Sequence, residues 1–197
     1  MALDICLIPM TRPLLVGEAI RSAKACGWKV IVEDGAKGAP VTREKLFNAA
    51  LSLGARYVRY SDDDDPGIKG SVNDILENSG ADILYGDYHL ISRGHTLTHR
   101  YTGNVLKDLL YGMGIPPWAW IGKAGSLARL VPLWDSTVVR GDGSWMVLRA
   151  LYAGLKIVHI PAVIYTYRKT YGLPTLTNSF PMFSKECLRD WTSHFRS

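Results

Sequence analysis

Strand and helix signals alternate along the first third of the chain, and this alternation limits the possible folds more than any other feature of the sequence. Residues 5–9 form a short apolar run that is typical of a buried strand, and residues 14–25 carry apolar side chains at helical spacing. The later elements of the alternation are expected at residues 29–32 (strand), 42–53 (helix, capped by Thr42), 57–61 (strand), 71–78 (helix) and 82–85 (strand). Because single helices separate the strands, we predict an α/β fold with a doubly wound, mostly parallel sheet flanked by helices.

The second half of the chain is less regular but continues to show short elements. Residues 114–120 contain paired prolines, which stop both helices and strand ladders, so this segment is expected to be a loop. The other elements expected here are two strands joined at Arg93-Gly94 within residues 88–99, a helix at 104–111 capped by Asn104, helices at 124–130, 143–153 and 184–195, and strands at 157–160 and 163–167. The sequence shows no internal repeat or linker, so residues 1–197 are predicted to form a single domain.

The composition is that of an ordinary globular protein, with 47% hydrophobic and 21% charged residues. No apolar run approaches the roughly 18 to 20 residues that a membrane span needs, and the N-terminal segment lacks the basic leader of a secretory signal. Cys6, Cys26 and Cys187 fit no metal-binding spacing, and we interpret them as reduced thiols of a cytoplasmic protein. The net charge of +5 is explained either by ordinary solubility or by attraction to an anionic partner.

Charged residues gather where three of the predicted strands end. Arg12 follows the first strand, Asp34 follows the second, and four consecutive aspartates, residues 62–65, follow the third. In parallel sheets of this kind, ligands bind beyond the carboxyl ends of the strands. We therefore expect one arginine and two acidic segments to meet at a single edge of the sheet.

Four adjacent carboxylates repel one another, so residues 62–65 need either solvent or a counter-charge. One interpretation is a solvated surface loop. A calcium-binding loop fits less well, because the spaced ligands and the central glycine of an EF-hand are missing. The position directly after a buried strand favours a divalent cation bound beside a phosphate-bearing ligand. Mg²⁺ and Mn²⁺ suit such a site because they prefer oxygen ligands and keep open positions for phosphate.

Several short motifs occur in the order in which a known family carries them. They are Ile8-Pro9-Met10-Thr11-Arg12-Pro13, Glu33-Asp34-Gly35, Asn48-Ala49-Ala50-Leu51 with Gly54, Tyr57-Val58-Arg59-Tyr60 followed by Asp62 to Asp65, and a late group of Asp142, Arg149, Gly154, Pro161 and Tyr165-Thr166-Tyr167-Arg168. Over roughly residues 3–170 the chain thereby resembles the family-two glycosyltransferases, which have a GT-A fold. The resemblance implies metal-dependent transfer of a sugar from a nucleoside diphosphate sugar, such as a UDP-sugar, to an acceptor hydroxyl, usually with inversion at the anomeric carbon.

The resemblance also implies roles for individual residues. Nucleotide-sugar contacts would come from Pro9, Arg12, Asp34, Arg43, Asp62 and Asp63, and a Mn²⁺ or Mg²⁺ ion would be held by Asp64 and Asp62. Residues 1–100 would then bind the nucleotide sugar, and residues 101–197 would bind the acceptor and carry the catalytic base, Asp142. The base would take the proton of the acceptor hydroxyl as it attacks, and the metal would neutralise charge on the departing nucleoside diphosphate.

The family's binding residues are not all present. Phe47 stands where the family often has an arginine, and Arg43, one helical turn earlier, is expected to take its place. Thr170 occupies the position of a histidine that often contacts the metal. Aspartates, phosphates and water would therefore hold the cation.

The catalytic base is the second departure from the family pattern. Counted back from Arg149, Gly143 falls on the catalytic acid of the family, and Asp142 falls on the residue before it. The base is therefore either Asp142, after a shift of one residue in the loop, or another acid, for which Asp135 is the reserve candidate.

Four tryptophans lie in the half expected to bind the acceptor. Trp118 and Trp120 flank the loop where an acceptor would enter, and their rings are expected either to stack on a sugar or base or to pack the loop onto the domain. Trp134 and Trp145 are expected in the core. The acceptor stays open among a glycan or lipopolysaccharide precursor, a protein side chain and a hydroxylated nucleic-acid base.

Two other functions stay open at this stage. One is a nucleotidyltransferase that makes sugar nucleotides on a related sheet, although residues 10–13 lack the glycine-rich loop typical of that class. The other is a non-catalytic module that binds nucleotide sugars with the same fold, which would suit a chain with an altered catalytic position.

Overall fold

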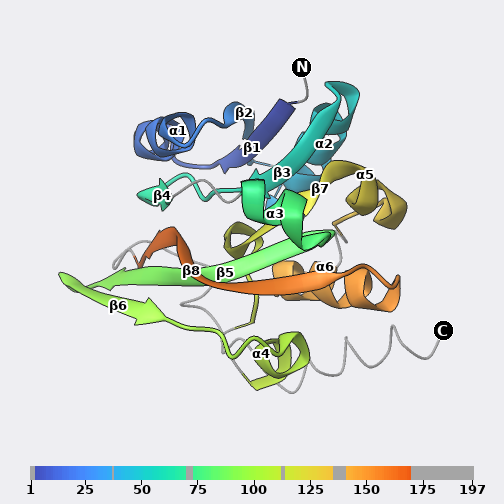
Figure 1. Ribbon diagram of the computed structural model, residues 1–197. Helices are drawn as coiled ribbons and strands as arrows, with labels where there is room; N and C mark the ends of the chain where they lie inside the picture. Colours follow the sequence, from blue (N-terminus) through green and yellow to red (C-terminus); the bar gives the residue numbers. More distant parts are fainter. Residues whose placement is uncertain (1–2, 37, 70–72, 112–113, 135–140, 170–197) are drawn as a thin grey trace.

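The computed structural model describes residues 3–36, 38–69, 73–111, 114–134 and 141–169 (Figure 1). They form one sheet flanked by helices, with strand order β2-β1-β3-β7-β5-β8-β4 and with β6 paired to β5. The elements are β1 (Leu3–Met10), α1 (Val16–Ala25), β2 (Lys29–Asp34), α2 (Ala39–Ser52), β3 (Ala55–Tyr60), β4 (Gly67–Ile68), α3 (Asn73–Ser79), β5 (Ile83–Ser92), β6 (His95–His99), α4 (Val105–Tyr111), η1 (Pro117–Ala119), β7 (Trp120–Lys123), α5 (Ala124–Leu127), η2 (Ala128–Leu130), α6 (Asp142–Tyr152) and β8 (Ile157–Arg168). The helix expected at 184–195 and Cys187 lie outside the described residues.

The predicted α/β class with a mostly parallel sheet is confirmed, although short antiparallel strands interrupt and border it. β1 pairs in parallel with β2 and β3, and β5 pairs in parallel with β8 over a long ladder. β7 runs antiparallel between β3 and β5, so the strand after α3 does not lie beside β3 as it would in a simple doubly wound sheet. A strand of four residues leaves no periodic signal in a sequence, which is why residues 120–123 were not expected to be one.

Two pairs of predicted strands are single long strands in the structure. The segments expected at 82–85 and 88–92 form β5, which continues through a hairpin at Arg93-Gly94 into β6 (Figure 1). The segments expected around Pro161 form β8, and the β5–β8 register skips Pro161 because proline has no N–H for the ladder. Gly86 lies opposite this irregularity, where a Cβ atom would come within 2.9 Å of the carbonyl oxygen of Ala162.

The helix caps are predicted correctly in one case and wrongly in another. Asn104 caps α4, since its Oδ1 accepts a hydrogen bond from the backbone N–H of Lys107 at 3.0 Å. α2 begins at Ala39 rather than after Thr42, with a proline in its first turn. Thr42 Oγ1 donates to the carbonyl oxygen of Gly38 at 2.9 Å, so it lies inside the first turn and does not cap the helix.

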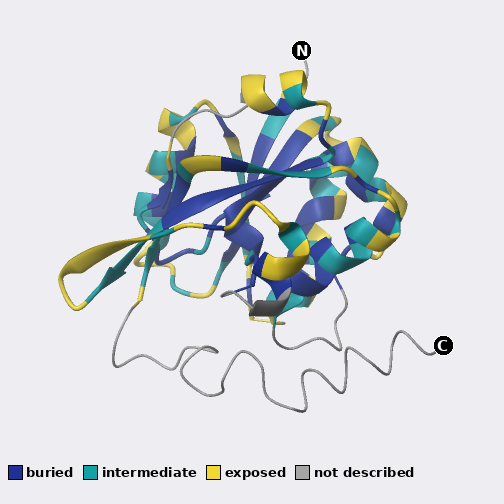
Figure 2. Cartoon of the chain, turned by 60° about the horizontal axis from the view of Figure 1, so that its bottom comes forward, coloured by how far each residue is buried: buried dark blue, intermediate teal, exposed yellow. Residues whose placement is uncertain are grey.

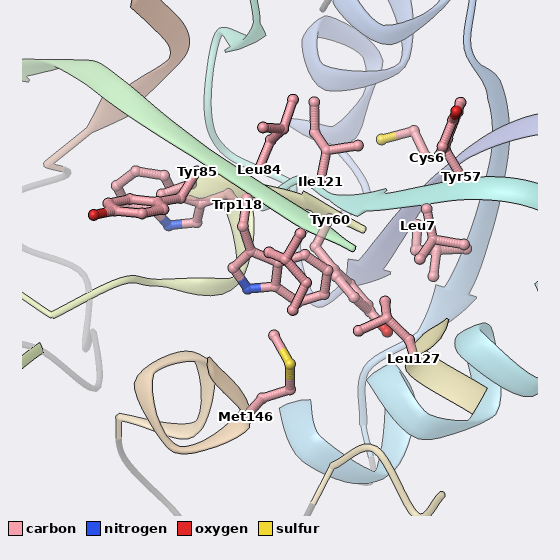
Figure 3. Packing of buried hydrophobic residues seen from close by; sticks show 14 of the residues in the cluster. Cys6, Leu7, Tyr57, Tyr60, Leu84, Tyr85, Trp118, Ile121, Leu127 and Met146 are labelled. Atoms are coloured by element: carbon pink, nitrogen blue, oxygen red, sulfur yellow. The ribbon is translucent and has the colours of Figure 1, made fainter. Parts of the chain in front are cut away.

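The interior contains apolar residues from most strands and from the inner faces of the helices, while exposed residues line the outer helix faces and the β5–β6 hairpin (Figure 2). Figure 3 shows Met146 of α6 pointing toward the buried aromatic group that includes Tyr60 and Trp118. Cys6 and Cys26 are free thiols, as expected. Within the described residues, none of the helices has the length and apolar character that crossing a membrane requires.

The start of α6 packs directly against the segment before η1. Ser144 Oγ accepts a hydrogen bond from the backbone N–H of Ile115 at 2.9 Å. A Cβ atom on Gly143 would lie 2.6 Å from the nitrogen and the Cδ of Pro117 and 2.8 Å from the carbonyl oxygen of Ile115. Gly143, the position at which the resemblance noted above places a catalytic acid, therefore has no room for a side chain, and the neighbouring Asp142 is the carboxylate that this helix start presents.

We predict that Gly143→Ala lowers the free energy of unfolding by about 1–3 kcal/mol, because the added methyl group must push the Pro117 backbone away. The matched control is Gly125→Ala in α5, where a Cβ would meet nothing within 4 Å. This control is expected to be neutral or slightly stabilising, because alanine favours helix. Urea unfolding of the three proteins measures both effects, and equal stability of the two variants would contradict the packing argument.

Candidate functional site

The carboxyl ends of β1, β2 and β3 meet at one edge of the sheet. Asp34 is the last residue of β2 and stands opposite Met10 at the end of β1. Thr11 and Arg12 begin the loop after β1, and residues 61–65, called the acidic turn below, directly follow β3. The structure therefore brings the arginine and the two acidic segments to the same edge.

Asp63 joins the acidic turn to the loop after β1. Its carboxylate accepts hydrogen bonds from the backbone N–H groups of Thr11 and Arg12, and Thr11 Oγ1 donates another at 3.1 Å. Arg12 Nε lies 3.2 Å from the second oxygen of the same carboxylate. Only 2% of Asp63 is exposed, so this side chain, expected to contact the nucleotide sugar, is instead occupied in holding the loop.

Arg12 reaches a second carboxylate of the acidic turn. Its Nη1 forms an ion pair with Asp64 Oδ2, and the Asp64 side chain is only 8% exposed. A third of the Arg12 side chain, 33%, stays exposed. Arg12 thus places a positive charge at the surface of the edge, beside the carboxylate that was expected to be the main metal ligand.

Arg43 of α2 links the acidic turn to the start of α6. Its guanidinium pairs with Asp142 through Nη1 and lies 3.6 Å from Asp62 Oδ1 through Nη2. The guanidinium also lies over the indole of Trp134, 5.3 Å from the ring centroid. Burial opposes the charge on Arg43, but Asp142 and Asp62 together raise its pKa above the ordinary value. Three segments far apart in the sequence therefore meet at one buried cation.

Negative charge exceeds positive charge at this edge. Burial raises the pKa of Asp62 to about 6, Arg43 opposes this shift, and the neighbouring carboxylates, first among them Asp64, add to it. Four carboxylates, those of Asp62, Asp63, Asp64 and Asp142, pair with the two guanidinium groups of Arg12 and Arg43. Carboxylates thus outnumber guanidinium groups among the paired side chains of this edge.

Asp65 faces the interior, where it contacts β8. Its carboxylate is fully buried and accepts hydrogen bonds from the Tyr165 hydroxyl at 2.9 Å and from the backbone N–H of Arg168 at 2.7 Å. Burial raises the pKa of Asp65, while these hydrogen bonds oppose the shift. The late sequence motif contains Tyr165 but predicts no role for it. A tyrosine that directly follows the apolar residues Val163 and Ile164 of a predicted strand is the signal that could have pointed to a buried hydroxyl partner.

Two further residues expected at the nucleotide sugar lie in β1 and β2. Asp34 is exposed, and its Oδ1 accepts a hydrogen bond from the backbone N–H of Ala36 at 2.9 Å. Pro9 is buried within β1, opposite Glu33 in the parallel ladder. Of this pair, Asp34 therefore presents its side chain at the surface of the edge.

The two tryptophans expected near the acceptor are core residues in the structure. Trp118 is 6% exposed and stacks on Tyr165 and Tyr167, with ring centroids 4.8 and 5.1 Å away. Trp120 is fully buried in β7 and packs against Tyr60 and Trp134. Their rings pack onto other aromatic side chains, which is one of the two arrangements expected for them, and contact with an acceptor stays a prediction. Trp134 and Trp145 are buried, as expected.

A metal site with three or more His, Cys, Asp or Glu ligands is not preformed in the part of the chain that the structure describes. Asp62 and Asp64 offer two carboxylates at the edge, with 28% and 8% of their side chains exposed. Mg²⁺ and Mn²⁺ are often held by only one or two carboxylates, with phosphate and water completing the shell. The donor set fits such a cation. Asp135 and Thr170, which bear on the base and on a metal contact, lie outside the described residues.

No protein-family model matches the sequence, and a search of curated proteins gives no match. Solved structures do match the fold. The structure of S. aureus TarS 1–349 in complex with UDP matches with a TM-score of 0.62 and 12% sequence identity over 86% of this chain. The complex of the same protein with UDP-GlcNAc matches with a TM-score of 0.62 and 11% identity over 88% of this chain.

A shorter protein matches along nearly its whole length. A197 from STIV has a TM-score of 0.58 and 12% identity, and the match covers 88% of this chain and 99% of that one. By contrast, this chain spans only 61% of the TarS structure. At these identities the likeness establishes the fold, and it agrees with the GT-A-type α/β architecture predicted from the sequence.

We predict that Arg43→Met lowers the free energy of unfolding by about 3 kcal/mol or more, because it leaves Asp62 and Asp142 without their shared counter-charge. The matched control is Arg56→Met, since Arg56 also pairs with two carboxylates but is 40% exposed. Surface pairs contribute about 0–1 kcal/mol, so the control is expected to cost little. Urea unfolding compares the two variants, and equal losses would show that the Arg43 pairs do not hold the fold together.

Proposed function

We propose that this chain is a glycosyltransferase that moves a sugar from a nucleoside diphosphate sugar to an acceptor hydroxyl, with a Mn²⁺ or Mg²⁺ ion at the edge beyond β3. The observation that carries the proposal is the Arg43 bridge, which holds Asp62 and Asp142 against one guanidinium. In a transferase, the catalytic base must lie close to the bound donor sugar, because the positioning of the reacting groups supplies much of the rate enhancement. The bridge supports this arrangement.

The fold likeness supports the choice of donor. The matched TarS structures hold UDP and UDP-GlcNAc, so we propose a UDP-sugar as the donor of this chain. Asp34 and Arg12, both at the same edge, would then contact the nucleotide. The acceptor proposed is a hydroxyl of a glycan or lipopolysaccharide precursor or of a hydroxylated nucleic-acid base, and the net charge of +5 suits a polyanionic acceptor.

Asp62 and Asp64 would hold the divalent cation. When bound, the cation would neutralise the charge that develops on the departing nucleoside diphosphate. The charges of the site support this part of the proposal, because carboxylates outnumber guanidinium groups there. A diphosphate that approached these carboxylates without an added cation would be repelled.

Asp142 would act as the base. Its Oδ1 accepts a hydrogen bond from the backbone N–H of Gly143 at 2.9 Å, and its Oδ2 pairs with Arg43, so the carboxylate has a fixed orientation. In the proposed step, the acceptor oxygen forms a bond to the anomeric carbon as Asp142 takes its proton. The bond from that carbon to the diphosphate oxygen breaks, and the diphosphate leaves with the electron pair; because the acceptor attacks from the opposite face, the anomeric configuration is inverted.

One observation favours a second candidate, a non-catalytic module that binds nucleotide sugars. Both carboxylate oxygens of Asp142 already have partners within the protein. A residue whose oxygens are engaged in this way can serve as an anchor for Arg43 rather than as a base. The two candidates differ in turnover and agree in donor binding.

We predict that Asp64→Ala weakens UDP binding in the presence of Mn²⁺ by about tenfold or more, because it removes one of the two carboxylates proposed for the cation. Removing Mn²⁺ with EDTA is expected to weaken binding to the unchanged protein to a similar extent. Isothermal titration calorimetry measures both, with Asp74→Ala, an exposed acid of α3, as the control. Full Mn²⁺-dependent affinity in Asp64→Ala would refute the metal assignment.

Asp142→Asn is expected to reduce turnover by about 100-fold or more while UDP affinity changes by less than about twofold, because the amide keeps the shape but cannot take a proton. Release of UDP from a panel of UDP-sugars, with and without Mn²⁺, measures turnover. Retained turnover would assign the base to another residue. Tight UDP binding by the unchanged protein without any transfer or hydrolysis would favour the binding module.

A further inference from the structure

The Tyr165 hydroxyl lies beneath the acidic turn and contacts three of its five residues. It donates to Asp65 Oδ2 at 2.9 Å and accepts a hydrogen bond from the backbone N–H of Asp62 at 2.9 Å. Ser61 Oγ lies 3.0 Å from the same oxygen. A single side chain of β8 therefore fixes both the first residues and the last residue of the turn.

The ring of Tyr165 is also fixed in place, by burial and by stacking. The residue is fully buried, and its ring stacks on Trp118 with centroids 4.8 Å apart and planes inclined by 15°. Burial raises the pKa of Tyr165 well above its ordinary value, so the hydroxyl keeps its proton and remains a donor to Asp65. The direction of the hydroxyl is thus set by packing before any ligand arrives.

The carboxylates of the acidic turn point in two different directions. Asp63 and Asp65 face inward, to the loop after β1 and to β8. Asp62 and Asp64 face Arg43 and Arg12 at the edge. Carboxylates placed this close repel one another, so keeping each one with its own partner needs fixed hydrogen bonds. The Tyr165 hydroxyl supplies two of them, to the carboxylate of Asp65 and from the backbone of Asp62.

We propose that Tyr165 is a positioning residue for the donor site. Its hydroxyl holds the acidic turn in the conformation that places Asp62 beside Arg43 and Asp64 beside Arg12, so binding of a cation with a nucleoside diphosphate depends on a residue that does not itself touch either ligand. This inference rests on the proposed function, and it assigns the tyrosine of the late motif a role in the metal and diphosphate part of the site.

The test separates the hydroxyl from the ring. Tyr165→Phe keeps the stack on Trp118 and removes only the oxygen. Tyr167→Phe is the matched control, because its ring stacks on the same indole at 5.1 Å, from two residues further along the same strand. Affinity for UDP in the presence of Mn²⁺ is measured by calorimetry, and thermal unfolding of each variant is recorded beside it.

Tyr165→Phe is expected to weaken Mn²⁺-dependent UDP binding by about tenfold or more, and Tyr167→Phe by less than about twofold. A merely structural role would lower the unfolding temperature of Tyr165→Phe without this loss of affinity at a temperature where the variant is folded. Should Tyr165→Phe fail to fold, Asp65→Asn tests the same link with the ring intact. It removes the negative partner of the hydroxyl and is expected to weaken binding in the same way.

The outcomes distinguish this inference from the proposed function. If the unchanged protein binds UDP with Mn²⁺ and neither Tyr165→Phe nor Asp65→Asn differs from Tyr167→Phe, the positioning role is refuted and the proposed function stands. If the unchanged protein does not bind UDP with Mn²⁺ at all, the proposed donor site and the role of Tyr165 both fail.

Discussion

Mutual repulsion among carboxylates is the constraint on which the rest of this site depends. Four aspartates in a row can stay together within a protein only if each finds a donor or a cation. Here the partners come from three other segments: from α2 for Asp62, from the loop after β1 for Asp63 and Asp64, and from β8 for Asp65. The need to balance charge therefore joins residues that lie as many as 103 positions apart in the sequence.

For this reason, the four consecutive aspartates are not four equivalent candidates for metal ligands. Asp63 and Asp65 are 2% and 0% exposed, and their carboxylates accept hydrogen bonds from backbone N–H groups of other segments. They therefore act as anchors that fix the turn to the rest of the fold. The other two acids, Asp62 and Asp64, pair with the side chains of Arg43 and Arg12. Under the proposed function, the cation contacts would come from the alternate positions Asp62 and Asp64, and the anchors Asp63 and Asp65 hold the turn that carries them.

The parts of the fold that the sequence predicts are those with local signals. The β1-α1-β2-α2-β3 alternation follows from the spacing of apolar residues, and the shared edge follows from parallel strands. Contacts between side chains that lie far apart in the sequence leave no such local signal. Nothing near Arg43 in the sequence indicates Asp142 as its partner, 99 residues away, and nothing near Trp118 indicates that Tyr165 and Tyr167 cover its ring. β7 was missed because its partners, rather than its own four residues, make it a strand.

The residues proposed to carry out the chemistry also hold the fold together. Arg43 is buried between two carboxylates, and Asp142 begins a helix that packs against Pro117 without room for one methyl group. A substitution that removes such a side chain changes stability and activity together. A loss of activity then does not show whether the residue acts on a ligand. Substitutions that keep the shape and remove a single charge or oxygen leave the packing intact. In a site of this kind, only those changes can separate residues that act on a ligand from residues that hold others in place.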